Sequence, residues 1–489
     1  MTPAQRIDNW SDWLSPMVVK EVRQMVRGRE FNYSFALSVL IGLVAAFFGG
    51  MEALAGAVGA GAGIFVGLMT CLTLIGVAVV PVGTLNALRV ERSERTLDLI
   101  TVTALSPRKI VIGKLLSQAV KLLTLFAGLA PFMAMSFLLG GIDFLTIILS
   151  LTTLFIWSLW ACSAALVLSS LTKSRGLSIA VSAVAALVFL VIAGLGRSVY
   201  YAALYSGYGV AGSLGFMTGF HGPEDGWRFA AMVAICLTSM ANLILLSENR
   251  LSPPTFDSVT PLRIGFLAQF LVILGMIVAS MPSAGGAASG AAPLVTLLGV
   301  FAGLQLAAVA TFTVSEELTP RHRVRSLKKS EWEWTMVLLR PGGGRGAAYV
   351  LVQMILLLGV GKYLAPPDSD FNWLIATCGY ICFFTGVPAL IAQGLSPKFF
   401  PPPYTRVAIL LFFSGLSLIA EIMHYAGTGS NEAISVYHVL SPFRALANWN
   451  PVENNHWDSY VFTLGFFGLL SYFGLVHLAR NYSRDGYKH

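Results

Sequence analysis

The chain has 489 residues, of which 56% are hydrophobic and only 11% are charged, with a formal net charge of +8. Such a composition excludes a disordered chain and an ordinary soluble domain, and it is typical of a protein that crosses a membrane several times. Apolar runs of about 20 residues, the length with which a helix spans a bilayer, recur along the whole chain. Because backbone groups in lipid must be hydrogen-bonded within their own segment, we expect these runs to be helices.

A polar segment precedes the first apolar run. Ser15 and Pro16 are typical of a helix start, because serine caps free N–H groups and proline fits the first helical position. In the following stretch, apolar residues recur on one helical face and basic residues occupy the other, namely Lys20, Arg23 and Arg27. This pattern predicts an amphipathic helix in the membrane interface, with its basic side toward anionic headgroups or a partner. The alternative is a plain basic flank of the first span.

The apolar runs predict an all-α polytopic membrane protein of about twelve transmembrane helices in two six-helix halves. Spans of the first half are predicted at residues 33–51, 63–88, 111–139, 144–171, 177–194 and 229–246. Those of the second half are predicted at residues 264–281, 293–314, 347–364, 373–393, 407–423 and 460–478. Each half has its largest charged loop after its second span, at residues 89–110 and 315–346.

The distribution of positive charge predicts the orientation of these spans. With both termini in the cytoplasm, almost all of the 32 lysines and arginines fall in cytoplasmic segments or, like Lys121, near the inner end of a span. The exceptions are Arg197, Arg228, Lys362 and Arg444. This bias is what the positive-inside rule predicts. Since the basic residues are spread over loops along one membrane face, we expect no nucleic-acid partner.

The first large loop, Glu91 to Lys114, is the most distinctive stretch of the chain. Glu91, Glu94 and Asp98 recur at helical spacing, which predicts a short charged helix. Ser106 and Pro107 then predict the start of the next membrane helix. A bare connection between spans needs only a few residues, so we expect this loop to contact a partner.

Charged residues are scarce within the predicted spans. We expect Lys121 to extend toward the inner surface, because it lies two to three turns into its span. Glu421 and His424 lie three residues apart near an outer end, where a proton-coupled role is a minor alternative. Six amide side chains in the predicted spans are expected to form interhelical hydrogen bonds: Asn86, Gln118, Asn242, Gln269, Gln305 and Gln353. The five cysteines lie in apolar runs and are expected to behave as small buried hydrophobic residues.

Sequence patterns of phosphate-binding loops and of catalytic sites do not occur in the chain. The pairs Gly113-Lys114 and Gly361-Lys362 have neither the preceding glycine nor the following Ser or Thr of G-x-x-x-x-G-K-[ST]. The histidines show no tight metal-binding spacing. We therefore expect no enzymatic activity, cofactor or metal in this chain, and any ATP would be hydrolysed by another chain.

The loop resembles the first inner loop of permeases of the type-2 ATP-binding-cassette transporter family. In that family E-R, T-L-[DE], T-x-L-S-P and G-K follow one another. The matching residues here are Glu91, Arg92, Thr96, Leu97, Asp98, Thr103, Leu105, Ser106, Pro107, Gly113 and Lys114. The N-terminal VVKEVRQMVRGREF is similar to the interfacial helix of the family, and the resemblance covers about residues 15–250.

The resemblance implies a transport subunit, an exporter in most of the family, in a bacterial-type cytoplasmic (inner) membrane. A coupling helix in the loop would dock on a separate cytoplasmic ATPase subunit that carries ATP and Mg²⁺. The resemblance assigns this contact to Glu91, Glu94, Thr96, Leu97, Asp98, Thr103, Leu105, Ser106 and Pro107. Membrane lipids surround such a subunit, and a second permease completes the transporter.

The predicted organisation has four parts. Residues 1–32 carry the interfacial helix, 33–247 form a six-span permease domain, 248–263 form a cytoplasmic linker, and 264–489 form a second six-span half. The second half is a degenerate permease-like domain or an accessory domain. Either one chain supplies both units of a transporter, or two chains pair as a homodimer or heterodimer. Prolines before the seventh span exclude a repeat of the amphipathic helix there, which favours pairing.

A twelve-span secondary transporter of the major facilitator kind is the alternative. It also has two six-span halves with charged loops after the second and eighth spans. It predicts a G-x-x-x-D-R-like loop and several charges within the membrane, whereas this chain reads RVERSER and has few such charges. A membrane-embedded transferase is a third possibility that lacks a candidate acid, base or metal cluster.

Overall fold

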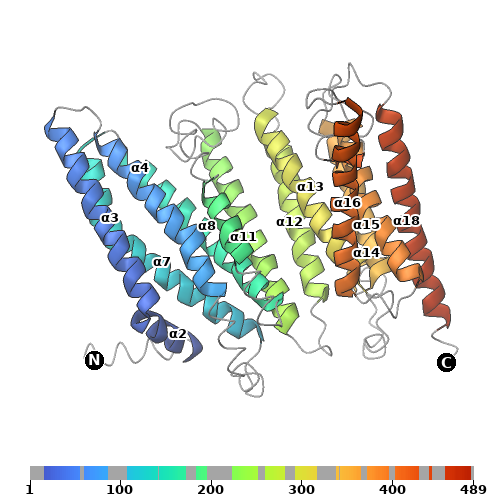
Figure 1. Cartoon of the computed structure of the whole chain (residues 1–489), viewed down its shortest axis with the longest axis horizontal. Helices are drawn as coiled ribbons and strands as arrows, with labels where there is room; N and C mark the ends of the chain where they lie inside the picture. The colour runs from blue at the N-terminus through green and yellow to red at the C-terminus, as the bar shows by residue number, and fades with distance from the viewer. Residues whose placement is uncertain are drawn as a thin grey trace. The chain divides into compact units, whose positions relative to one another are not determined.

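The computed structural model describes residues 16–55, 60–85, 107–140, 142–171, 183–194, 223–251, 259–280, 292–316, 338–340, 342–364, 372–395, 402–428, 440–442 and 457–485. The regular structure of these residues is helical (Figure 1). Ten of their helices are long and apolar enough to cross a membrane, which confirms an all-helical, multi-pass membrane architecture. The chain divides into two compact units, Met1–Ser258 and Val259–His489, here called unit 1 and unit 2.

Unit 1 begins with the short helix α2 (Pro16–Arg27), which Gly28 separates from the long helix α3 (Arg29–Leu54). The second span joins α4 (Ala60–Thr73) to a π-helix, η1 (Leu74–Val79), and helical structure continues to Leu85. The remaining elements of unit 1 are α7 (Pro107–Leu138), α8 (Phe144–Leu171), a short apolar helix (Ala183–Gly194) and α11 (Pro223–Leu251).

The core of unit 1 lies where the second span meets α7 and α8. Phe65 and Leu68 of α4 are fully buried, as are Leu122 of α7 and Ala161 of α8. Helix α3, by contrast, keeps most of its apolar side chains on the surface of the unit. Lipid accepts such apolar surface without cost, so this exposure is expected of a membrane protein and does not by itself indicate a binding site.

Unit 2 contains six long helices: α12 (Val259–Ser280), α13 (Ala292–Val314), α14 (Gly343–Leu364), α15 (Asn372–Leu395), α16 (Pro402–Thr428) and α18 (Trp457–Asp485). The closest pair is α15 and α18, whose glycines allow the two backbones to approach. A Cβ at Gly379 would lie 3.0 Å from the Cα of Gly465, and one at Gly468 would lie 2.5 Å from the backbone nitrogen of Phe383. Small residues at such crossings are typical of membrane helices.

Wherever it is described, each predicted span coincides with an apolar helix, and for α8 the predicted and observed ends agree. For two predicted spans the apolar segment identified is short, namely Ala183–Gly194 and the Gly299–Val314 part of α13. The total of twelve spans and the sides of the two termini therefore stay predictions. Helix α11 continues to Leu251 and α12 begins at Val259, so both helices extend into the segment predicted as a linker.

Candidate functional site

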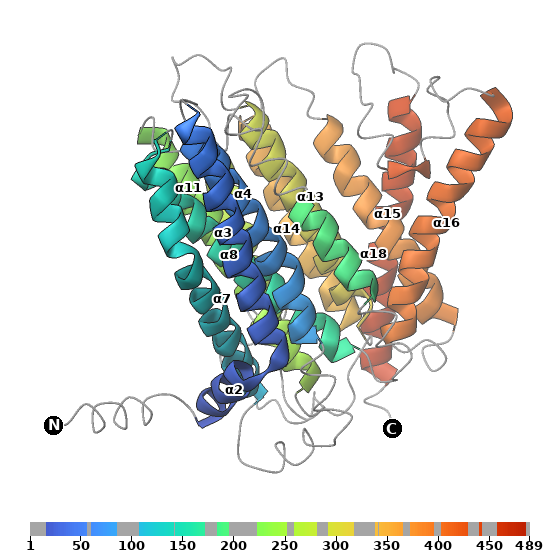
Figure 2. The same cartoon turned by 60° about the vertical axis from the view of Figure 1, so that its left-hand side comes forward.

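Helix α2 packs against α7, the helix that follows the first large loop. It contacts both α7 and α3, and Figure 2 shows it lying across the lower ends of these two helices. The predicted amphipathic helix is thus observed, and it ends at Arg27. Arg23 and Arg27 are exposed, as expected for its polar face, whereas the side chain of Lys20 lies outside the described part. Its depth in a membrane interface stays a prediction.

Of the predicted ATPase-contact residues, Pro107 alone falls in the described part of the chain. It is the first residue of α7, as the Ser-Pro pair predicts. The other predicted contact residues, Glu91, Glu94, Thr96, Leu97, Asp98, Thr103, Leu105 and Ser106, lie outside the described residues. Gly113 and Lys114, which end the motif, are both buried in α7.

A hydrogen bond joins the second span to α8 next to the first large loop. The Ser169 hydroxyl of α8 donates a hydrogen bond of 3.1 Å to the carbonyl oxygen of Leu85, the last described residue before the loop. Both residues are buried. One edge of the loop is therefore joined to α8, while the other continues directly into α7.

Two lysines are buried on one face of α7. Lys114 and Lys121 are seven residues apart, so two helical turns bring them to the same side, and their exposed fractions are 3% and 7%. Lys121 lies near Cys162 of α8, to which Thr84 of the second span forms a side-chain hydrogen bond. Protein atoms cover the side chain of Lys121, and its extension toward the inner surface stays a prediction.

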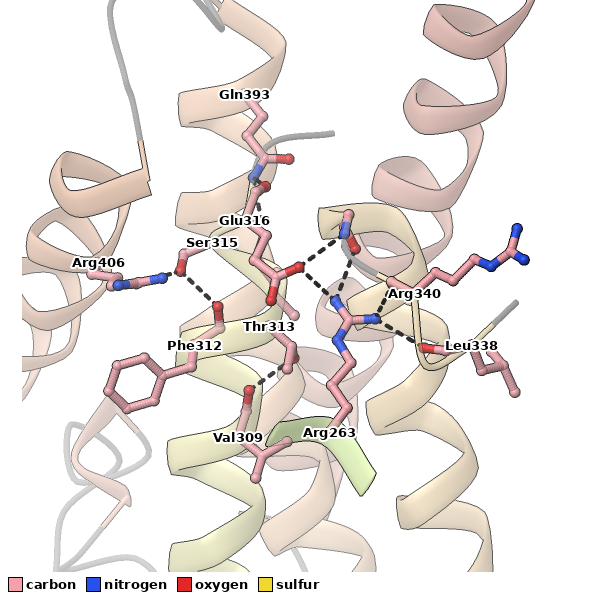
Figure 3. A network of polar contacts seen from close by, with 12 residues as sticks. Arg263, Val309, Phe312, Thr313, Ser315, Glu316, Leu338, Arg340, Gln393 and Arg406 are labelled. Carbon is pink, nitrogen blue, oxygen red and sulfur yellow. Dashed lines mark hydrogen bonds and ion pairs between the residues drawn. The ribbon is translucent and has the colours of Figure 1, made fainter. Parts of the chain in front are cut away.

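Unit 2 contains a polar network that joins the two ends of the second large loop of the chain, which is predicted at residues 315–346 (Figure 3). Arg263, in the second turn of α12, is only 1% exposed. Its Nη2 donates to Glu316 Oε2 at 2.7 Å. Glu316 is the second residue after the end of α13. Its Nη1 donates to the carbonyl oxygens of Leu338 and Arg340 at 2.9 and 2.7 Å, and Nη2 also reaches Gly342 O at 3.2 Å.

Glu316 and Gly342 complete this arrangement. The Gly342 N–H donates to Glu316 Oε2 at 2.8 Å, so the two edges of the loop are also bonded to each other. Gly342 has a φ of 140°, a conformation that residues with a side chain rarely adopt. Burial raises the pKa of the Glu316 carboxyl, and the charge of Arg263 and the Gly342 N–H oppose that rise. The ion pair is therefore what favours the charged form of this carboxyl.

Helices α15 and α16 join the network at the end of α13. Gln393 Nε2 donates to the carbonyl oxygens of Val314 and Glu316, at 3.0 and 3.1 Å, and so satisfies groups that a helix end leaves free. Arg406 Nε donates to Ser315 Oγ at 2.9 Å, and its guanidinium carbon lies 5.1 Å from the centre of the Phe312 ring. The ends of five helices of unit 2 thus meet at residues 314–316.

Arg263 is further fixed by α14. The Tyr349 hydroxyl donates to the backbone oxygen of Arg263 at 2.6 Å, and the Arg263 guanidinium lies 5.8 Å from the centre of the Tyr349 ring. One tyrosine therefore holds both the backbone and the side chain of this arginine. A buried arginine with all these partners is a rigid connection between helices, and nothing in its geometry positions a nucleophile or a proton acceptor for catalysis.

Sequence reasoning missed this network. The predicted linker includes Arg263 and the predicted second large loop includes Glu316, and the sequence assigned a partner to neither. Of the residues predicted to form interhelical hydrogen bonds, Gln305 of α13 does so, because its Nε2 donates to Phe266 O of α12 at 2.9 Å. The visible signals for the network were an arginine near the start of α12, a glutamate just after α13 and the glycine-rich start of α14.

Comparison with known protein families, with curated proteins and with solved structures finds no match to this chain. The class of this protein therefore follows from its architecture. Ten long apolar helices, with buried charges at helix ends, make this a multi-pass helical membrane protein.

Proposed function

We propose that this chain is the permease subunit of an ATP-binding-cassette transporter, an exporter that a separate cytoplasmic ATPase energises. The observation that carries the proposal is the run from Glu91 to Lys114, which has the residue types and order of a coupling loop. The arrangement next to this run supports it. The amphipathic helix α2, which the same family places before its first span, lies against α7, the helix into which the run leads.

Helix α7 is suited to carry a displacement of the loop into unit 1. It is a continuous helix of 32 residues that begins at Pro107, where the loop ends. It contacts α2, α3, α4, α8 and α11. A helix with this many neighbours can pass a shift at its start to the group of spans around it, as the closure of an ATPase pair requires.

A pull-down of the tagged full chain in mild detergent tests the proposal. The test variant combines Thr96→Ala, Leu97→Ala and Asp98→Ala. The matched control combines Lys173→Ala, Ser174→Ala and Arg175→Ala, in another loop on the same predicted side. We expect a nucleotide-hydrolysing subunit to copurify with the wild type and the control, and to be lost from the test variant.

The same experiment reports the assembly. Two differently tagged copies that copurify with the ATPase indicate that two chains pair, whereas one copy with two ATPases indicates that one chain supplies both units. If no ATPase copurifies with folded wild-type protein, or if the test variant retains it, the proposal is wrong.

The buried lysines of α7 favour one second candidate, an ion-coupled transporter. Ionisable side chains within a membrane mark ion pathways in many transporters, and Lys114 and Lys121 share a helix face. That candidate predicts that Lys121→Met abolishes transport driven by a proton gradient in vesicles that contain no ATPase. The coupling-loop proposal predicts no such transport by the wild type.

A further inference from the structure

Three arginines come together at the start of α14 in unit 2. Arg263 reaches from α12 to the backbone oxygens of Arg340 and Gly342, at 2.7 and 3.2 Å. Arg340 lies just before α14, and Arg345 is the third residue of this helix. Arg345 thus follows Arg340 by five residues, at the same end of α14 as the Arg263 guanidinium. Arg406 does not belong to this group, because it lies on the other side of Glu316 from Arg340 (Figure 3).

The positive charge of this group is not balanced within the described part of unit 2. Glu316 is the one carboxylate in contact with it, and Arg263 Nη2 and the Gly342 N–H already bind its Oε2. Among the described residues, neither Arg340 nor Arg345 forms an ion pair with a carboxylate. Like charges held close together at partly buried positions repel one another, so a bound anion would stabilise the arrangement.

The first turn of α14 leaves Arg345 accessible. This turn reads Gly-Gly-Arg-Gly, and its glycines fit against neighbouring helices, since a Cβ at Gly343 or Gly346 would collide with the end of α13 and one at Gly344 with α18. At 100° per residue, Arg345 lies on the side of α14 that faces away from α13. It is partly exposed.

We propose that Arg340 and Arg345 bind the phosphate group of an anionic lipid in the inner leaflet. Arg345 belongs to the apolar span Gly343–Tyr363 and lies at its predicted cytoplasmic end. A cation at this end of the span is level with the lipid headgroups. The cytoplasmic leaflet carries anionic lipids that attract basic groups next to membrane helices. The proposal is independent of whether an ATPase binds the first loop.

Native mass spectrometry of the detergent-purified full chain tests the proposal. The protein is titrated with phosphatidylglycerol, with phosphatidylcholine and with inorganic phosphate, and bound molecules are counted. The test variant combines Arg340→Gln and Arg345→Gln. The matched control combines Arg108→Gln and Lys109→Gln, two exposed cations in the first turn of α7 on the same predicted side. Folding is checked by the protection of Cys378 and Cys382 from a thiol reagent.

We expect the test variant to bind its tightest phosphatidylglycerol on the order of 30-fold more weakly than the wild type. The control should change this affinity less than about threefold, a bound inferred from its isolated, exposed charges. Equal losses in both variants would indicate general surface charge and overturn the proposal. If inorganic phosphate at equal concentration displaces the lipid, the ligand of this site is a free anion and the lipid proposal is overturned.

Two further variants keep the test decisive. Arg340→Lys with Arg345→Lys retains both charges and should hold the lipid within about threefold of the wild type. Loss of lipid from this variant, with its cysteines still protected, would overturn the electrostatic argument. If the glutamine pair fails to fold, Arg345→Gln alone should weaken phosphatidylglycerol binding about fivefold. An unchanged affinity in that folded single variant would also overturn the proposal.

Discussion

The two units hold the loops after their second spans in different ways. In unit 1, α7 begins at Pro107 and lies against α2, and in the described part of the other edge a hydrogen bond from Ser169 to Leu85 joins α8 to the second span. In unit 2, one buried side chain binds both edges, because Arg263 contacts Glu316 before the loop and three backbone oxygens after it.

The difference has a mechanical meaning. A helix that is held against another by van der Waals contacts can shift with it, because each of these contacts is weak. A buried guanidinium with several partners has one arrangement, because any shift leaves charged or polar groups without hydrogen bonds. Unit 1 is therefore suited to pass on a displacement of its loop, as the proposed function requires, whereas unit 2 is suited to hold the base of its loop still.

The largest expected effect concerns Arg263. Arg263→Met retains much of the apolar stem but leaves the Glu316 carboxylate without its ion-pair partner and the backbone oxygens of Leu338 and Arg340 without the guanidinium donor. Breaking a buried pair in this way costs about 3–5 kcal/mol of stability. We expect Cys378 and Cys382 of unit 2 to react with a thiol reagent at a lower denaturant concentration than in the wild type.

Unit 1 supplies the internal reference for this prediction. Cys71 and Cys162 are buried there, and their protection should change little. Arg23→Met, at an exposed position of α2, is the matched control and should leave all four thiols as protected as in the wild type. If Arg263→Met exposes the thiols of both units equally, the network does not act within unit 2 alone and the comparison fails.

A middle-sized effect is expected at the start of α14. A Cβ at Gly346 would collide with the backbone oxygen of Thr313, so Gly346→Ala should push α14 away from α13. Overpacking of this kind costs about 1–3 kcal/mol. Gly359→Ala is the control on the same helix, where a Cβ would meet nothing within 4 Å, and it should be neutral or stabilise by up to about 1 kcal/mol. Denaturant titration of both variants distinguishes packing from helix propensity.

The helices were predictable because their signal is local. Long apolar runs predict the spans, and Ser106-Pro107 predicts that α7 begins at Pro107, where the structure begins it. The face of α2 that carries Arg23 and Arg27 follows from helical periodicity alone. Each of these features depends on residues within a few turns of one another.

The network around Arg263 could not be predicted in the same way. Glu316 is 53 residues away in the chain, and the other acceptors are backbone oxygens, which carry no sequence signal. The sequence also does not show which face of α7 packs against other helices. The seven-residue spacing of Lys114 and Lys121 can be read from it, but their burial cannot. Contacts of this kind follow from the packing of whole helices.

The smallest expected effect concerns the connection in unit 1. Ser169→Ala removes the hydrogen bond to Leu85 O and should cost about 0.5–1.5 kcal/mol, well below the effect at Arg263. Ser163→Ala is the matched control on the same helix, because its hydroxyl bonds only to Trp160 O of α8 itself, and it should cost less than about 0.5 kcal/mol. Protection of Cys71 and Cys162 reports both. If Ser169→Ala destabilises unit 1 as much as Arg263→Met destabilises unit 2, the loop of unit 1 is held as rigidly as that of unit 2, and its proposed movement loses its physical basis.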